Sequence, residues 1–500
     1  MITPVEYDQL DGLAMAALIR TGQLTAADLC AAAIARAQAV NPQINAVVCA
    51  LYEQAQQRAG AGLPAGPFGG VPFLLKDFGA QYTGAPHTSG SRALRNFVPT
   101  GDAELVRRWQ VAGLNILGKT NTPEFALMGV TEPVLFGPAR NPWNLGHTPG
   151  GSSGGAAAAV AAGIVPVAGA GDGGGSIRIP AACCGLFGLK PSRGRVPTGP
   201  EQGEKWQGAA VEHVVSRSVR DSAALLDATQ GGDVGAPYFL PDPVRPYLEE
   251  VSCSPGRLRI GFSLEHPLGS VLHPECATAV RDAAKLLESL GHEVEEVPLP
   301  FDGRAVASAF LMLYFGETGA SIAALAKVLG RPARLHDVEP TTWLLGLLGR
   351  TYSATDFAAA RHTWNDIARC MGRFHQTYDL LLTPTLATPP VRIGELQPKH
   401  TEQLLLKLVN TFGLGGLIRR SGIVEKLAEQ SLEKTPYTQV ANLTGQPAMS
   451  VPLHWTADGL PCGVQFIAPL GGEDGLFRLA GQLEQAQPWF GRRPALVGQS

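Results

Sequence analysis

Apolar residues recur at two spacings along this chain, and the alternation between the two predicts an α/β fold. Over residues 4–60, small and aliphatic residues return every three or four positions, which indicates helices. Thr25, with Asp28 three positions later, fits the start of one helix, and Asn41-Pro42 is expected to end it. Further helices are predicted over residues 104–112, 156–162, 219–229, 273–290 and 476–486, with a mainly helical stretch over 303–376.

Short runs of consecutive apolar residues lie between these helices and predict buried strands. They occupy residues 71–77, 164–168, 258–262, 292–297, 378–383 and 463–467, with one more between 113 and 121. Strands that alternate with helices in this way imply an α/β fold in which helices cover both faces of a large sheet.

No linker interrupts this pattern, so residues 1–500 are expected to form a single domain. Its expected parts are N-terminal helices (1–60), a core that carries the candidate chemistry (65–240) and a C-terminal α/β part (255–500) with a helical insert at 303–376 and a leucine-rich insert at 401–434.

Composition and charge exclude several classes of function. Of the 500 residues, 45% are hydrophobic and 17% charged, which suits a large folded core, and a net charge of −3 gives no basic footprint for nucleic acid. The N-terminal MITPVEYDQLDG lacks signal-peptide features, and no uninterrupted apolar run predicts a membrane-spanning helix. The eight cysteines lack metal-ligand spacing and indicate reduced thiols in a cytoplasmic protein.

The candidate chemistry lies between residues 148 and 191, where serines stand among glycines. Ser152 and Ser153 follow a glycine pair, and Ser176 follows three consecutive glycines. Such glycines let backbone N–H groups turn toward one point. A serine at the end of this turn can attack a carbonyl while those N–H groups hold the oxygen that becomes negative. A tight connecting loop without chemistry is the alternative interpretation.

Two nucleotide-binding patterns match this region literally but fail in context. Residues 169–174 (GAGDGG) fit G-x-G-x-x-G, yet residues 177–179 run into Pro180, so no helix of useful length is expected there. Residues 113–120 (GLNILGKT) fit the Walker A pattern, yet a helix is predicted before the first glycine and the strand lies inside the motif. Neither pattern is therefore expected to bind a nucleotide.

Lys76 ends the apolar strand at 71–77 and has two interpretations. A lysine at the end of a strand ordinarily lies in solvent. If its apolar neighbours desolvate it, the lysine pKa falls, and the neutral amine can act as a base.

The leucine-rich stretch at 404–424 (LLLKLVNTFGLGGLIRRSGIV) has three interpretations. It is a pair of core helices, a lid over a substrate pocket or a hairpin that faces a membrane, although membrane anchoring usually requires a stronger amphipathic moment.

Three separated segments together resemble the amidase signature family of serine hydrolases. They are GVPFLLKD at 70–77, PGGSSGG at 149–155 and DGGGSIRIPA at 172–181. The separation of Ser152 and Ser176 matches the family as well, and so do GKTNTPEF at 118–125 and NLTGQP at 442–447. The resemblance covers most of the chain and implies the amidase signature fold, a large mixed twisted sheet with helices on both faces.

The resemblance implies an amidase that cleaves a carbon–nitrogen amide bond through a Ser–cis-Ser–Lys triad. Ser176 would be the nucleophile that forms an acyl-enzyme, Ser152 the bridging serine after a cis peptide bond, and Lys76 the base in its neutral form. The oxyanion hole would consist of the backbone N–H groups of Gly173, Gly174, Gly175 and Ser176. Because an unperturbed lysine has a pKa of about 10.4, activity is expected to rise on the alkaline side.

Other positions acquire expected roles by the same resemblance. Ser153, Asp172 and Arg178 would support the nucleophile loop. The pocket wall would include Ala126, Leu127 and Met128, for which simple loop packing is the alternative.

Gly173 departs from the Thr, Ile or Ala that the family commonly has at this position. The glycine-rich loop around it resembles the branch that includes hydrolases of nylon-type cyclic amides, the 6-aminohexanoate cyclic dimers.

Other functions stay open. One is the amidase subunit of a glutamyl-tRNA(Gln) amidotransferase, which works with partner proteins. Another is a fatty-acid amide or ester hydrolase. A third is a His-dependent serine esterase, although no G-x-S-x-G elbow surrounds Ser176. The main interpretation implies a small-molecule amide substrate, no metal and no organic cofactor, and no contact with nucleic acid or membrane, and it is compatible with a homodimer.

Overall fold

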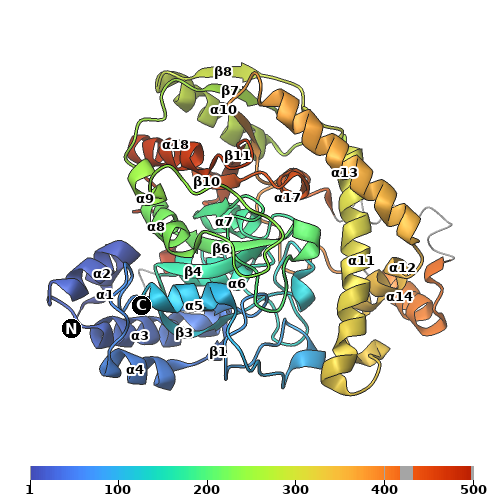
Figure 1. The fold of residues 1–500 in the computed structure, drawn as a ribbon, viewed down its shortest axis with the longest axis horizontal. Helices are drawn as coiled ribbons and strands as arrows, with labels where there is room; N and C mark the ends of the chain where they lie inside the picture. Colours follow the sequence, from blue (N-terminus) through green and yellow to red (C-terminus); the bar gives the residue numbers. More distant parts are fainter. Residues whose placement is uncertain (1, 399, 417–431, 497–500) are drawn as a thin grey trace.

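The computed structural model describes residues 2–398, 400–416 and 432–496, and one mixed sheet of eleven strands forms its centre (Figure 1). The strands are β1 (Val47–Ala50), β2 (Pro72–Lys76), β3 (Asn115–Thr120), β4 (Val167–Asp172), β5 (Phe187–Lys190), β6 (Val211–Ser216), β7 (Arg259–Phe262), β8 (Glu293–Glu296), β9 (Leu380–Pro384), β10 (Ala448–Trp455) and β11 (Pro461–Ile467). Their order in the sheet is β1-β3-β2-β4-β6-β5-β10-β11-β9-β7-β8.

Parallel and antiparallel pairs alternate by region in this sheet. Strands β3, β2 and β4 are parallel near one end, and β9, β7 and β8 are parallel at the other. The strands between these groups pair antiparallel. The expected large mixed sheet is therefore confirmed.

The helices that surround the sheet follow the predicted order. They are α1 (Pro4–Asp8), α2 (Gly12–Arg20), α3 (Ala26–Ile44), α4 (Tyr52–Ala61), α5 (Glu104–Val111), α6 (Gly154–Ala161), α7 (Arg178–Cys184), α8 (Val219–Thr229), α9 (Tyr247–Glu250), α10 (Pro274–Ser289), α11 (Gly303–Leu329), α12 (Pro340–Gly349), α13 (Ala354–Phe374), α14 (His400–Phe412), α17 (Gln439–Thr444) and α18 (Glu473–Ala486). Short 3-10 turns are η1 (Arg92–Leu94), η2 (Glu124–Ala126), η3 (Trp206–Gly208) and η4 (Leu335–Asp337).

Strand β5 shows that helices cover both faces of the sheet. Neighbouring residues of a strand point to opposite faces. Phe187 packs against Phe477 of α18, with ring centroids 6.3 Å apart. The next residue, Gly188, faces α7, because a Cβ there would lie 2.6 Å from the Cβ of Ala181. The predicted layers are thus confirmed at the middle of the sheet.

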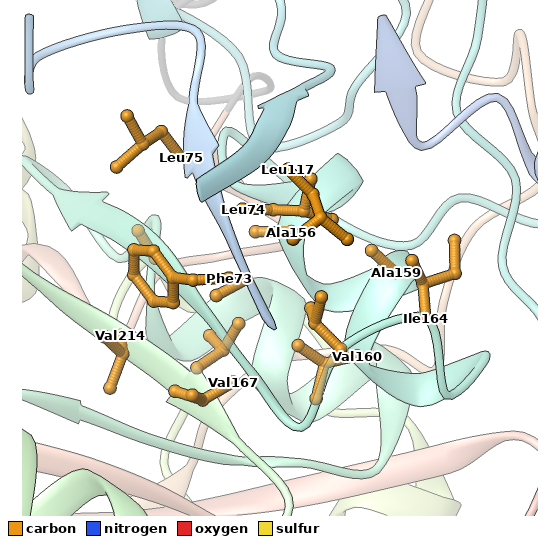
Figure 2. Packing of buried hydrophobic residues seen from close by; sticks show 14 of the residues in the cluster. Phe73, Leu74, Leu75, Leu117, Ala156, Ala159, Val160, Ile164, Val167 and Val214 are labelled. Atoms are coloured by element: carbon orange, nitrogen blue, oxygen red, sulfur yellow. The ribbon is translucent and has the colours of Figure 1, made fainter. Parts of the chain in front are cut away.

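The largest apolar cluster surrounds the strands that carry the candidate site. Figure 2 shows side chains from β2, β3, α6 and the segment between α6 and β4 that belong to this cluster. Phe73, Leu74 and Leu75 of β2 are fully buried, as is most of the alanine-rich α6. Small residues on α6 allow the helix to lie close to the strands, so the backbone on either side of the site is held rigidly.

Two predictions for the N-terminal region are wrong. Helix α3 does not end at Asn41-Pro42 but continues to Ile44, where Asn45 in the left-handed region ends it. Pro42 lies in the last turn, so its missing N–H leaves the rest of the helix intact. The all-helical expectation for 4–60 also fails, because the short strand β1 pairs antiparallel with β3.

Two further corrections concern the segment around the glycine triplet. The strand expected at 164–168 runs instead from Val167 to Asp172, where pairing with β6 holds a glycine-rich sequence extended. A helix that was not expected, α7, begins at Arg178. Pro180 lies in its first turn, where a backbone N–H has no partner within the helix in any case.

The helical insert lies at one side of the molecule (Figure 1), with α11, α12 and α13 packed together and α14 against α12. Among the described residues, α11 alone is long and apolar enough to span a membrane by length and composition, and 39% of its most apolar window is buried in the protein. Val409 and Asn410 of α14 are buried, and Asn410 Nδ2 donates to Pro340 O at 2.8 Å. Residues 417–424 of the leucine-rich stretch lie outside the described residues, so its three interpretations stay open.

Candidate active site

Strand β2 and the loop before α6 bring Lys76 and Ser152 together. Lys76 Nζ donates to Ser152 Oγ at 2.6 Å and lies 3.5 Å from Gly171 O at the end of β4. The Gly151–Ser152 peptide bond is cis, as the family resemblance implies. Since β2 and β4 are adjacent parallel strands, their carboxyl ends meet at the same edge of the sheet.

Lys76 is buried, with 3% of the residue exposed. Burial lowers the pKa of Lys76 to about 7, against the opposing effect of the Glu212 and Asp172 carboxylates. Glu212 is itself held by Lys205, whose Nζ lies 3.0 Å from its Oε2. A substantial fraction of Lys76 is therefore neutral near pH 7 and able to accept a proton, and the alternative of a solvated lysine is wrong.

Ser153 forms hydrogen bonds with both backbone groups of Gly171, near the end of β4. Its Oγ donates to Gly171 O at 3.2 Å and accepts from Gly171 N at 3.3 Å. These bonds tie the serine loop to the strand that leads into the glycine triplet.

Asp172 and Arg178 form a fully buried ion pair beneath the glycine triplet. Arg178 donates to both carboxylate oxygens of Asp172 at 2.9 Å, and both side chains are 0% exposed. Burial raises the pKa of Asp172, but the Arg178 charge and hydrogen bonds outweigh this and hold the pKa well below its usual range. The carboxylate is therefore ionised and locks the loop that holds Ser176.

Asn442 of α17 completes this buried network. Its Nδ2 donates to Asp172 Oδ1 at 2.9 Å and to Asp172 O at 3.0 Å, and its Oδ1 accepts from Arg178. Gln465 of β11 accepts a further Arg178 bond at 2.6 Å. The segment NLTGQP at 442–447 is thus far away in sequence but adjacent to the loop in space.

The glycine triplet needs glycine at two of its three positions. Gly175 has a φ of +125°, and a Cβ there would lie 2.4 Å from Thr438 Oγ1. A Cβ on Gly174 would lie 2.6 Å from Phe310 Cζ, whereas at Gly173 the nearest atom would be 3.5 Å away. The family's usual larger residue at Gly173 is therefore compatible with the available space.

The N–H groups of this loop differ in their partners. Gly175 N donates to Asp172 Oδ1 at 2.7 Å, so it points into the buried network. Among the described residues, the N–H groups of Gly173, Gly174 and Ser176 have no hydrogen-bond partner.

A cavity of about 430 Å³ opens over these groups. Its wall includes most of the residues singled out from the sequence, namely Lys76, Ala126, Leu127, Met128, Ser152, Asp172, Gly173, Gly174 and Ser176. Gly175, Ser153 and Arg178 lie behind this wall rather than in it. Ser176 is the partly exposed serine of the loop and faces the same space as the Lys76–Ser152 pair.

The sequence did not identify the aromatic side of this cavity. Trp206 of η3 lies 6.5 Å from Phe310 and 5.8 Å from Tyr314 between ring centroids, and all three line the cavity. Tyr314 also donates to Leu127 O, which links α11 to the predicted pocket wall. The helical spacing of Phe310 and Tyr314 was a detectable signal, but it did not show which face of α11 would meet the site.

The two nucleotide-binding patterns lack the required context in the structure as well. The Walker-like glycine at 113 follows helix α5, and β3 lies within the motif. The stretch 169–174 ends β4, and α7 begins only at Arg178 and spans seven residues. Among the described residues, no group of three or more His, Cys, Asp or Glu side chains is arranged to hold a metal ion.

A buried amine on a serine hydroxyl, a second serine and free N–H groups at one cavity are the components of an amide-cleaving serine hydrolase. The family comparison agrees, because the Amidase family model matches residues 28–415 and 423–477. This chain belongs to the amidase signature family and hydrolyses carbon–nitrogen amide bonds.

Individual relatives narrow the similarity. The chain is 40% identical to the 6-aminohexanoate-cyclic-dimer hydrolase of Paenarthrobacter ureafaciens, over 98% of this chain and 97% of that protein. A solved structure of 6-aminohexanoate cyclic dimer hydrolase with substrate superposes with a TM-score of 0.90 at 39% identity, covering 98% of this chain and 99% of that one. A bacterial aryl acylamidase superposes with a TM-score of 0.82 at 27% identity, over 97% and 99% of the two chains.

Proposed function

We propose that this amidase hydrolyses cyclic or linear amides of the 6-aminohexanoate type through an acyl-enzyme on Ser176. The observation that supports this most directly is the 2.6 Å bond from Lys76 to Ser152 at the wall of the cavity that Ser176 also lines. The names of the similar hydrolases supply the substrate class.

In the proposed reaction, neutral Lys76 takes the proton of Ser152 while Ser152 takes the proton of Ser176. Ser176 Oγ then bonds to the amide carbonyl carbon, and a negative oxygen forms. The free N–H groups of Gly173, Gly174 and Ser176 are the donors that we assign to this oxygen. Gly175 is left out of the hole, because its N–H is directed to Asp172.

The same relay completes the reaction in the other direction. The proton passes through Ser152 to the leaving nitrogen, the carbon–nitrogen bond breaks, and an ester remains on Ser176. A water molecule loses its proton through Ser152 to Lys76 and cleaves that ester. Ser152 can serve in both directions because a hydroxyl both donates and accepts.

A His-dependent esterase is less well supported. Among the described residues of the cavity wall, His87 is the one histidine, and its Nδ1 faces Lys119 Nζ at 3.3 Å rather than a carboxylate. Burial lowers the pKa of His87 well below its ordinary value, with Lys119 and Lys205 lowering it further. An acid that orients the histidine, as a Ser-His-Asp triad requires, is not in place.

The amidotransferase and fatty-acid amide alternatives differ from the main proposal in their reactions. A solved structure from the glutamyl-tRNA(Gln) amidotransferase of Thermotoga maritima superposes with a TM-score of 0.72 at 26% identity, less closely than the cyclic dimer hydrolase. Cytoplasmic localisation, a homodimer, and the absence of nucleic-acid or membrane partners stay predictions.

The test is hydrolysis of 6-aminohexanoate cyclic dimer, its linear dimer, glutamine, a long-chain fatty amide and a p-nitrophenyl ester by wild type and Ser176→Ala. We expect Ser176-dependent turnover of at least one 6-aminohexanoate amide. Ser176-dependent turnover of glutamine alone, or of the fatty amide alone, would replace the proposed substrate class. An unchanged rate in Ser176→Ala would contradict the assigned nucleophile.

A further inference from the structure

One face of α11 extends from the reaction centre toward the outer part of the cavity. Phe310, Tyr314, Glu317 and Ser321 all line the cavity, and their spacing of four, three and four residues places them on one side of the helix. Phe310 lies against Gly174 of the glycine triplet. Glu317 follows Phe310 by seven residues, which corresponds to about 10 Å along the helix axis.

The wall changes character along this face. Near the glycine triplet it is apolar, formed by Trp206, Phe310 and Tyr314. Beyond the aromatic groups, the next residue of η3 and the next turn of α11 supply a polar pair, in which Gln207 Nε2 donates to Glu317 Oε1 at 3.0 Å. An apolar wall that ends in a carboxylate fits a ligand with an apolar chain that ends in a cation.

Most other charges of the cavity already have charged or hydrogen-bonding partners. Asp172 pairs with Arg178 and Glu212 with Lys205. Among the described residues, Glu317 has no ion-pair partner, and Gln207 is a neutral donor to one of its two oxygens. The Glu317 carboxylate therefore keeps acceptor capacity and an uncompensated negative charge.

We propose that Glu317 binds the terminal ammonium of an amide substrate, whose scissile carbonyl lies at Ser176 and whose apolar chain follows the Trp206–Phe310–Tyr314 wall. This inference rests on the proposed function and makes it narrower, because it favours linear amides with a primary ammonium over neutral amides. Lys434 also lines the cavity, so a preference for a terminal carboxylate is the opposite outcome.

The experiment uses three matched 4-nitroanilides that differ only at the end of the acyl chain. They are the 6-aminohexanoyl, hexanoyl and 5-carboxypentanoyl anilides, which are cationic, neutral and anionic near pH 8. For the wild type we expect kcat/KM to be about tenfold higher for the cationic than for the neutral anilide, the usual value of a charge-assisted hydrogen bond. Because ammonium binding is uniform through the reaction, the difference should appear mainly in KM.

Two variants of Glu317 and one matched control assign the effect. Glu317→Gln should reduce the ratio of cationic to neutral kcat/KM to about one, and Glu317→Lys should make the anionic anilide the best of the three. Glu201→Gln is the control, since Glu201 also lines the cavity and also accepts one glutamine amide, from Gln81 at 3.0 Å. It should leave the ratio as in wild type.

The outcomes separate this inference from the proposed function. Ser176-dependent turnover of the hexanoyl anilide with no preference for the ammonium, or a preference that Glu317→Lys does not reverse, overturns the role of Glu317 alone. A wild-type preference for the anionic anilide does the same. Absence of Ser176-dependent turnover for all three anilides overturns both, and thermal melting of each variant verifies that it is folded.

Discussion

Two buried lysines end two strands of the same sheet, and only one of them lines the cavity. Lys76 follows Phe-Leu-Leu at the end of β2, and Lys190 follows Phe-Gly-Leu at the end of β5. Burial lowers the pKa of each to about 7, and both are nearly inaccessible to solvent. By burial and pKa alone, the two lysines are equivalent.

Their partners distinguish them. Lys76 donates to the hydroxyl of Ser152, which can pass a proton on, whereas Lys190 donates to the carbonyl oxygen of Pro191 at 2.8 Å, which cannot. Arg178 also lowers the pKa of Lys190, while Glu212 and Asp172 oppose the lowering at Lys76. A perturbed pKa therefore identifies a base only when a proton-conducting partner and a cavity accompany it.

The largest expected effect comes from removing each lysine in turn. Lys76→Met should lower kcat/KM for an amide by about 10²–10⁴-fold, the usual contribution of a general base. Lys190→Met, the matched control, should stay close to wild type. Steady-state kinetics with circular dichroism as the folding control measures both, and equal losses in the two variants would remove the distinction.

The partner is tested next. Ser152→Ala leaves the Lys76 amine in place but removes the hydroxyl that connects it to Ser176. We expect a loss of about 10²-fold or more in kcat, because proton transfer is interrupted at that link. Rates near wild type would mean that Lys76 reaches Ser176 without Ser152.

The pH dependence follows from the lowered pKa of Lys76. The neutral amine is the active form, so kcat/KM should rise about tenfold per pH unit below about 7 and level off above it. Lys190→Met should keep the same midpoint. A profile that is flat between pH 6 and 9 in both kcat and kcat/KM would contradict Lys76 as the base.

The smallest expected effect is on stability. Between about pH 7 and the ordinary lysine pKa, the unfolded chain binds the Lys190 proton and the folded chain does not. Each such lysine therefore makes the free energy of unfolding rise with pH by about 1.4 kcal/mol per unit over this interval.

Lys190→Met lacks this contribution, so its stability relative to wild type should be greatest near pH 7 and should decline toward pH 10. Urea unfolding at several pH values measures the trend. Parallel stability curves for the two proteins would show that Lys190 does not titrate at the lowered pKa.

The long periodic segments of this chain could be predicted from sequence. Helix α8 has the predicted bounds, Val219–Thr229, because both its capping residue and its apolar spacing are local. The wrong predictions concern segments whose structure depends on partners. Strand β4 consists largely of alternating alanine and glycine and is extended because β6 pairs with it, and β1 is too short to show an alternating pattern.

The candidate site divides in the same way. The glycine–serine motifs placed Ser152, Ser176 and the glycine triplet at the cavity, since their spacing and backbone requirements are local. Trp206, Glu317 and Asn442 were missed because each comes from a distant element, and nothing in its own neighbourhood shows which surface it meets.

By itself the sequence determined the class of fold, the serine-bearing glycine loops and, through the family resemblance, the expected amide chemistry. Only the tertiary structure decided which of two similar strand-end lysines meets a serine, where the Gly175 N–H points and which face of α11 lines the cavity. The physical reason is that helix capping, turns and periodicity act between near neighbours. Desolvation, ion pairing and cavity shape are set by segments that meet only when the chain is folded.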